Sequence, residues 1–114
     1  MKYSEFVNEI ESLYATHTSK LYHCQATVCR LTPSPTLHDT PIALVSYKTC
    51  VAVYLPHTSR LYVFDYYSPN TCHHICKFER WLRERHHDVV RINLYHRKRN
   101  KNGSYLVYDE EVGV

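Results

Sequence analysis

The spacing of apolar residues changes between residues 47 and 82, and this stretch predicts the centre of the fold. More and less apolar side chains alternate over residues 50–55, which is the period-two pattern of a half-buried strand. A break at residues 56–59 and a second apolar run at 60–64 predict a β-hairpin. Ser68-Pro69 then predicts a helix start, because the serine hydroxyl can accept a free backbone N–H and proline is tolerated in the first turn.

The helix that follows, from Pro69 to about His86, is expected to have an apolar side and a cationic side. Plotted at 100° per residue, its apolar residues share one arc that is expected to pack on the sheet. This arc consists of Ile75, Phe78 and Leu82, flanked by His74 and Trp81. The opposite side carries Lys77, Arg80, Arg83, Glu84 and His73.

The rest of the chain is expected to supply a second helix and further strands. Residues 4–15 have apolar side chains at helical spacing, and residues 21–31 alternate as in a strand. Three prolines at residues 32–41 predict a loop, since proline cannot donate to the interior of a sheet ladder. Residues 42–45 are expected to begin a strand that continues through a bulge into 47–55, and further strands are expected at 89–95 and 104–108.

These elements follow one another in the order α-β-β-β-α-β-β, which predicts an α+β fold. We expect a largely antiparallel sheet of about five strands with two helices packed on one face. The chain has 114 residues and is expected to form a single domain over residues 1–114. The proline-rich loop at residues 32–41 is long for so small a domain, so we expect it to be either functional or mobile.

The composition is typical of a folded protein in a reducing compartment. Hydrophobic residues make up 44% of the chain and charged residues 22%, which is too apolar for a disordered protein. The first nine residues are polar and acidic, unlike a signal peptide, and no apolar run reaches the roughly 20 residues of a membrane helix. We therefore expect a cytoplasmic protein whose five cysteines are free thiols.

Basic residues concentrate in the second half of the chain. Residues 77–101 hold nine basic and three acidic residues, although the formal net charge of the whole chain is only +3. Such a segment attracts acidic partners, and basic side chains interleaved with tyrosine suit phosphate contact and base stacking. The alternative is an ordinary solvated charged face. The candidate binding residues are Lys77, Arg80, Arg83, Arg91, Tyr95, Arg97, Lys98, Arg99 and Lys101.

Two other kinds of site have weaker support in the sequence. Cys72 and Cys76 are one helical turn apart and belong to the residue types that bind zinc, but no CxxC pair occurs and His74 is expected to lean away from Cys76. A cysteine–histidine nucleophilic pair would need a third orienting group, and no such pattern is present. Two glycines are too few for a glycine-rich phosphate loop. We expect no metal, no cofactor and no enzymatic activity.

The central block resembles a group of small proteins carried by phages and plasmids of Firmicutes. Their shared pattern is a Tyr-x-Thr-x-Val-Ala strand, a second strand, and then Tyr-Ser-x-x-Thr-x-x-His at a helix start. Here the first part is residues 47–52 and the second is residues 67–74, followed by Phe78. These proteins commonly have a second threonine just before the matched one, where this chain has Asn70. The pattern describes a hairpin and a capped helix whose His74 could lock the helix start to the sheet.

The resemblance implies a phage or mobile-element protein that acts in the host cytoplasm. Small proteins in that context, anti-CRISPR proteins among them, often work by binding host machinery. We therefore expect a stoichiometric inhibitor of a host defence complex, with a Cas nuclease of the Cas9 type, or its guide or target nucleic acid, as the leading partner. One alternative is a nucleic-acid-binding regulator that uses the basic 77–101 segment. A third reading is a small zinc-stabilised module.

Overall fold

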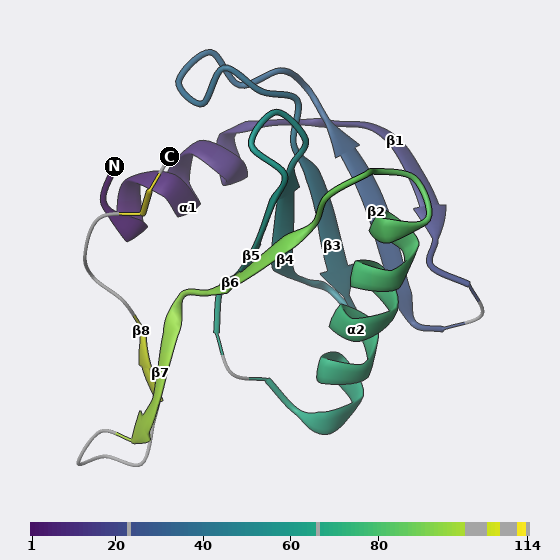
Figure 1. Cartoon of the computed structure of the whole chain (residues 1–114), viewed down its shortest axis with the longest axis vertical. Coiled ribbons are helices and arrows are strands. Elements are labelled where there is room, and N and C mark those ends of the chain that lie inside the picture. The colour runs from purple at the N-terminus through teal and green to yellow at the C-terminus, as the bar shows by residue number, and fades with distance from the viewer. Residues whose placement is uncertain (23, 66, 100–104, 108–111, 114) are drawn as a thin grey trace.

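The centre of the molecule is a six-stranded sheet with the strand order β1-β2-β3-β4-β5-β6 (Figure 1). We describe it from a computed structural model that covers residues 1–22, 24–65, 67–99, 105–107 and 112–113, with the backbone alone for 96–99 and 105–107. Neighbouring strands are antiparallel from β1 to β5, and β6 joins β5 as a parallel partner. These strands are β1 (Ala15–Lys20), β2 (Ala26–Leu31), β3 (Ile42–Ser46), β4 (Thr49–Leu55), β5 (Arg60–Val63) and β6 (Val90–Asn93).

Helix α2 (Pro69–Arg83) begins at the predicted cap and connects β5 to β6. The Ser68 hydroxyl accepts a hydrogen bond from the Thr71 N–H at 3.4 Å, and Pro69 occupies the first turn. A parallel pair of strands needs such a crossover, because a tight turn cannot join them. The predicted packing arc is confirmed, since all its members are buried: His74, Ile75, Phe78, Trp81 and Leu82.

The two helices lie on opposite faces of the sheet (Figure 1). In β2, Val28 belongs to the core under α2, whereas its neighbour Cys29 belongs to the core under α1 (Tyr3–Ser12). The α+β class and the largely antiparallel sheet are confirmed, but the expectation that both helices pack on one face is wrong. The physical reason is that the central strands are apolar on both sides, and β4 is buried from Val51 to Leu55. Neither helix in the described part of the chain is long and apolar enough to cross a membrane.

Among the described residues the element order is α-β-β-β-β-β-α-β-β-β, with more strands than expected. All six residues of β1 are exposed, so no apolar alternation marks this strand in the sequence. β3 and β4 form an antiparallel pair joined at Tyr47 and Lys48, whereas we expected one strand continuing through a bulge. Tyr47 makes this turn with φ of 59°, a conformation usually adopted by glycine or asparagine.

The segment expected as one strand at residues 89–95 is divided at Leu94. β6 precedes Leu94 and belongs to the large sheet, while β7 (Tyr95–Arg99) pairs with β8 (Tyr105–Val107) in a separate antiparallel ribbon. The predicted Asn102-Gly103 turn lies outside the described residues.

The proline-rich loop is anchored to two other parts of the molecule. Ser34 Oγ donates a hydrogen bond to Glu9 Oε1 of α1 at 2.7 Å, and Asp39 Oδ2 accepts one from the His57 N–H at 2.9 Å. Ser34 and Asp39 also bridge each other across the loop. The loop is thereby connected to α1 and to the β4–β5 turn.

Candidate functional site

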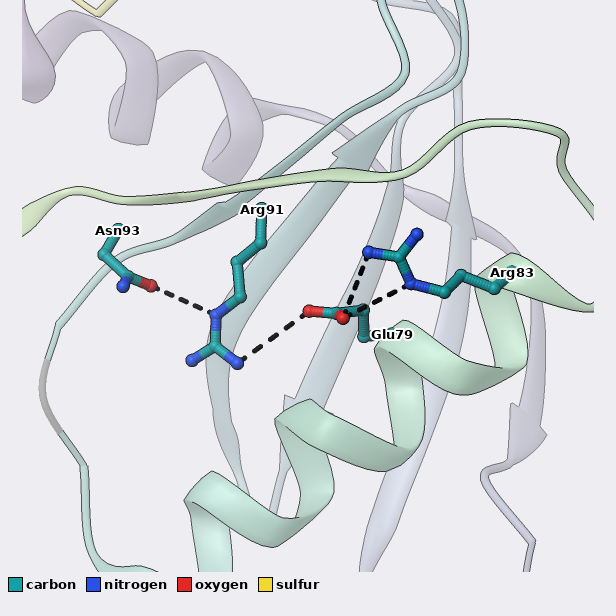
Figure 2. Close-up of polar contacts among 4 residues, drawn as sticks. All are labelled: Glu79, Arg83, Arg91 and Asn93. Atoms are coloured by element: carbon teal, nitrogen blue, oxygen red, sulfur yellow. Dashed lines mark hydrogen bonds and ion pairs between the residues drawn. The ribbon is translucent and has the colours of Figure 1, made fainter.

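Two of the predicted cations meet at one carboxylate on the side of α2 that faces β6. Figure 2 shows Arg83 of α2 and Arg91 of β6 reaching Glu79 from opposite sides. Arg83 Nη2 is 3.2 Å from Glu79 Oε2, and Arg91 Nη1 is 3.9 Å from Glu79 Oε1. Arg91 Nε also donates to Asn93 Oδ1 at 3.1 Å. The helix and the strand therefore do contribute to one surface, on which two guanidinium groups share a single negative charge.

Arg80 lies on the other flank of α2, beside the connection between β1 and β2. Its guanidinium carbon is 5.0 Å from the centroid of the Tyr22 ring, and Tyr22 Oη donates a hydrogen bond to Glu84 Oε1 at 3.2 Å. A cation over an aromatic face is held in place while its outer side stays hydrated and free to contact an anion. Lys77 lies one turn earlier on the same helix and lines a pocket described below.

The remaining predicted binding residues do not extend this surface in the described part of the chain. Tyr95 is 8% exposed and belongs to the core under α2, so its ring is not presented for base stacking. The side chains of Arg97, Lys98 and Arg99 lie outside the described atoms, as does Lys101 altogether.

A second cationic cluster lies around Trp81 at the end of α2, and the sequence does not predict it. The guanidinium carbon of Arg85 is 4.1 Å from the Trp81 ring centroid, and that of Arg30, from β2, is 5.9 Å away. His86 is close to both: burial first, and then the charges of Arg30 and Arg85, lower the pKa of its imidazole. Only the concentration of charge at the helix end was visible in the sequence, since Arg30 comes from a distant strand.

The cations on α2 or in contact with it lie on both flanks of the helix, and we group them as one cationic surface. Six positively charged side chains stand against the two carboxylates of Glu79 and Glu84 among the described residues of this surface. We call it the α2 surface. Its cations are Arg30, Lys77, Arg80, Arg83, Arg85 and Arg91.

Three residues of the resemblance pattern, Tyr47, Thr71 and His74, meet at the start of α2. Ser46 Oγ is 2.7 Å from His74 Nδ1 and 3.1 Å from Thr71 Oγ1, and all three residues are buried. The Tyr47 ring packs against His74 with 5.5 Å between ring centroids. His74 therefore does link the helix start to the sheet. Burial, and then the charges of Lys77 and His73, lower the pKa of His74 and favour its neutral form.

A pocket of about 500 Å³ opens beside this cluster. Its lining combines side chains from the β1–β2 connection, the β3–β4 turn and the first turns of α2, and it includes amides, imidazoles and one ammonium group. The lining residues are Cys24, Gln25, Tyr47, Asn70, His73, His74 and Lys77.

Two residues that could act as nucleophiles, Ser46 and Cys50, lack the setting that this requires. Ser46 is 2% exposed and its hydroxyl is occupied by two partners, so a substrate cannot reach it. Burial raises the pKa of Cys50 to about 12, which keeps that thiol protonated. All five cysteines are free, and within the described ranges no three His, Cys, Asp or Glu side chains are grouped so as to hold a metal ion.

This chain belongs to a family of unknown function, DUF8033, whose model matches residues 8–90. The matched region contains the whole of α2 and the pocket beside Tyr47, and it ends at the first residue of β6. No curated protein and no solved structure matches the chain.

Proposed function

We propose that this protein acts by stoichiometric binding of an acidic partner to the α2 surface. The observation that carries the proposal is the gathering of six cations on and around one helix, with two carboxylates between them. Several of these cations are held over aromatic rings or beside a carboxylate, which positions them and leaves positive charge facing outward. Guanidinium groups are also the side chains best suited to phosphate and carboxylate.

The form of this function that the sequence resemblance favours is inhibition of a host defence complex. An anti-CRISPR protein of this kind would bind a Cas9-type effector, in which a guide–target duplex lies within the protein. The α2 surface would then contact exposed guide RNA, target nucleic acid or an acidic patch of the effector. Binding through the positively charged α2 surface differs from imitation of DNA, because a protein that imitates DNA needs an acidic surface.

A nucleic-acid-binding regulator is the second candidate, and the pocket beside Tyr47 favours it. This pocket adds an exposed aromatic ring and amide groups to the cations of α2. Single-stranded nucleic acids bind to surfaces on which aromatic rings lie next to basic side chains.

The test of the proposed function removes charge from α2 without touching its core. In the Arg80→Gln/Arg83→Gln variant, affinity for the acidic partner is expected to fall. If the partner is nucleic acid, the slope of log K against log salt is expected to become shallower by about 0.7–0.9 for each lost phosphate contact. Fluorescence anisotropy with labelled RNA and DNA at several salt concentrations measures both quantities.

The matched control is Lys2→Gln/Lys20→Gln, which removes the same charge from exposed positions beside α1 and on β1. It should bind like the unmodified protein. A parallel assay adds the protein to a purified Cas9-type nuclease loaded with guide. Blocked cleavage without binding to free nucleic acid identifies the inhibitor, and binding to free nucleic acid identifies the regulator. If neither occurs, or if both variants behave alike, the α2 surface is not the binding site.

A further inference from the structure

The pocket beside Tyr47 is lined by a residue whose backbone is strained and whose side chain is exposed. Tyr47 has φ of 59°, in the left-handed region that bulky residues rarely occupy, and 57% of it is exposed. The turn is held by a hydrogen bond from the Tyr47 N–H to the Gln25 carbonyl at 3.0 Å. Strained residues that persist at the surface often mark functional positions, and here the strain presents an aromatic ring at the mouth of a pocket.

The inner side of this ring is supported by a rigid polar cluster. His74 packs against Tyr47, and the His74 ring is in turn fixed by the buried hydroxyls of Ser46 and Thr71. The ring of Tyr47 is therefore positioned before any ligand arrives, which reduces the ordering that binding would require. Its exposed part remains available for stacking.

The rest of the pocket lining supplies groups that complement a nucleotide. The amide side chains of Gln25 and Asn70 each offer donors and an acceptor, as base edges require. Lys77 supplies a cation on the same rim, from the helix that carries the α2 surface. The pocket volume of about 500 Å³ lies in the range of sites that hold small molecules.

We propose that this pocket binds an unpaired nucleotide, with the base stacked on Tyr47 and the phosphate near Lys77. The inference rests on the proposed function and narrows it, because it makes the acidic partner a nucleic acid with a free base. A base inside a duplex is stacked on its neighbours and cannot lie on Tyr47. Single strands and unpaired loops should therefore bind better than duplexes of the same sequence.

The test replaces the aromatic ring with an aliphatic side chain. Tyr47→Leu is expected to weaken binding of a single-stranded oligonucleotide about tenfold, since stacking on one aromatic ring contributes on that order. Tyr47→Phe keeps the ring and should bind like the unmodified protein. Tyr14→Leu is the matched control, because Tyr14 is 78% exposed and lies outside the pocket lining. Affinity for a duplex should be the same in all four proteins.

Titration with a mononucleotide shows whether the natural ligand is a free nucleotide or a nucleotide within a strand. If a free nucleotide is the natural ligand, it should bind as tightly as the oligonucleotide and lose affinity in Tyr47→Leu; a strand ligand should bind much more tightly than the mononucleotide. In the unmodified protein, the ring proton signals of His73 and His74 should shift during either titration. The histidine signals are measured in the unmodified protein, so they test the proposal even if Tyr47→Leu folds poorly.

Two outcomes would overturn the inference. One is equal affinity of the single strand for Tyr47→Leu, Tyr47→Phe and Tyr14→Leu, and the other is unmoved histidine signals during titration of the unmodified protein. If Arg80→Gln/Arg83→Gln still lowers affinity in that case, the proposed function stands and the pocket plays no part in it. If no nucleic acid binds at all, the inference fails, and the proposed function then depends on an acidic protein partner.

Discussion

Ser46 uses one hydroxyl to join a strand to the start of α2. Its Oγ contacts both Thr71 and His74, and each of these three polar residues is buried. Buried polar groups are tolerated only when their hydrogen bonds are satisfied, so this cluster constrains the position of the helix more strictly than apolar packing alone. A neutral His74 fits this setting, because a charged imidazole would have to lose its water.

The histidine makes stability depend on pH in a defined direction. In the folded protein the pKa of His74 is lowered below its ordinary 6.5. As the pH falls, the unfolded chain is therefore protonated at this histidine before the folded chain is. The free energy of unfolding should therefore fall as the pH drops through 6.5, until the folded protein is protonated as well. Denaturant unfolding at a series of pH values from about 8 to about 4 measures this dependence, because these values span the ordinary pKa of histidine.

His74→Gln should show a flatter dependence of stability on pH, and His87→Gln serves as its control at an exposed position. His86, whose pKa is also lowered, contributes in the same direction, so the dependence is reduced in His74→Gln and not abolished. An unfolding free energy that rises on acidification would contradict the assignment of a neutral, buried His74.

Among the elements, α2 follows most directly from its own sequence. Ser68 and Pro69 place its start, and its apolar arc is spaced for a single buried side. Ser68→Ala should lower the free energy of unfolding by about 1 kcal/mol, which corresponds to about 4 °C in Tm for a domain of this size. Ser68→Asp retains an acceptor for the Thr71 N–H and should remain near the unmodified Tm. Thermal unfolding followed by circular dichroism distinguishes them, and equal loss in both variants would contradict the capping role.

Other elements were not predictable for physical reasons that differ from case to case. β1 is an exposed edge strand without apolar alternation, and the β3–β4 turn has tyrosine where glycine or asparagine would have signalled it. The placement of the helices on opposite faces could have been predicted from the sequence. Residues 50–55 are nearly all apolar, and such runs indicate a strand covered on both faces.

The candidate site was predictable only in part. The cations of α2 follow from their spacing on a helix, whereas the approach of Arg30 to Trp81 depends on the fold. Tyr95 looked like a surface aromatic because strand alternation does not show which face is covered. The aromatic ring that the surface does present is Tyr47, and its exposure results from a turn that the sequence does not mark.

At the scale of the whole molecule, two separate cores share one sheet and should unfold together. Phe6 of α1 is fully buried, with its ring centroid 5.1 Å from that of Tyr62 in β5. The strand that carries Tyr62 also carries Leu61, which packs in the core under α2. Loss of either core therefore removes support from the other.

Phe6→Ala should lower the free energy of unfolding by about 3–5 kcal/mol, a large share of the roughly 5–15 kcal/mol of a typical domain. The loss should be visible at Trp81, the single tryptophan of the chain, although it lies on the far face. Denaturant unfolding followed by tryptophan fluorescence and by circular dichroism should give one shared midpoint. Val90→Ala, at a position 55% exposed, is the control and should change the midpoint little. Separate midpoints for the two probes would show that the cores are independent.

The parallel pairing of β5 with β6 has a consequence for the order of events during synthesis. Strands β2 to β5 each form an antiparallel pair with the strand made just before, so a nascent chain can pair them as they leave the ribosome. β6 also pairs with the preceding strand, but in parallel, so it can dock only after α2 has crossed the sheet. Until α2 and β6 have docked, the apolar surface beneath α2 and the free side of β5 stay uncovered, which makes this the interval in which a chaperone would be needed.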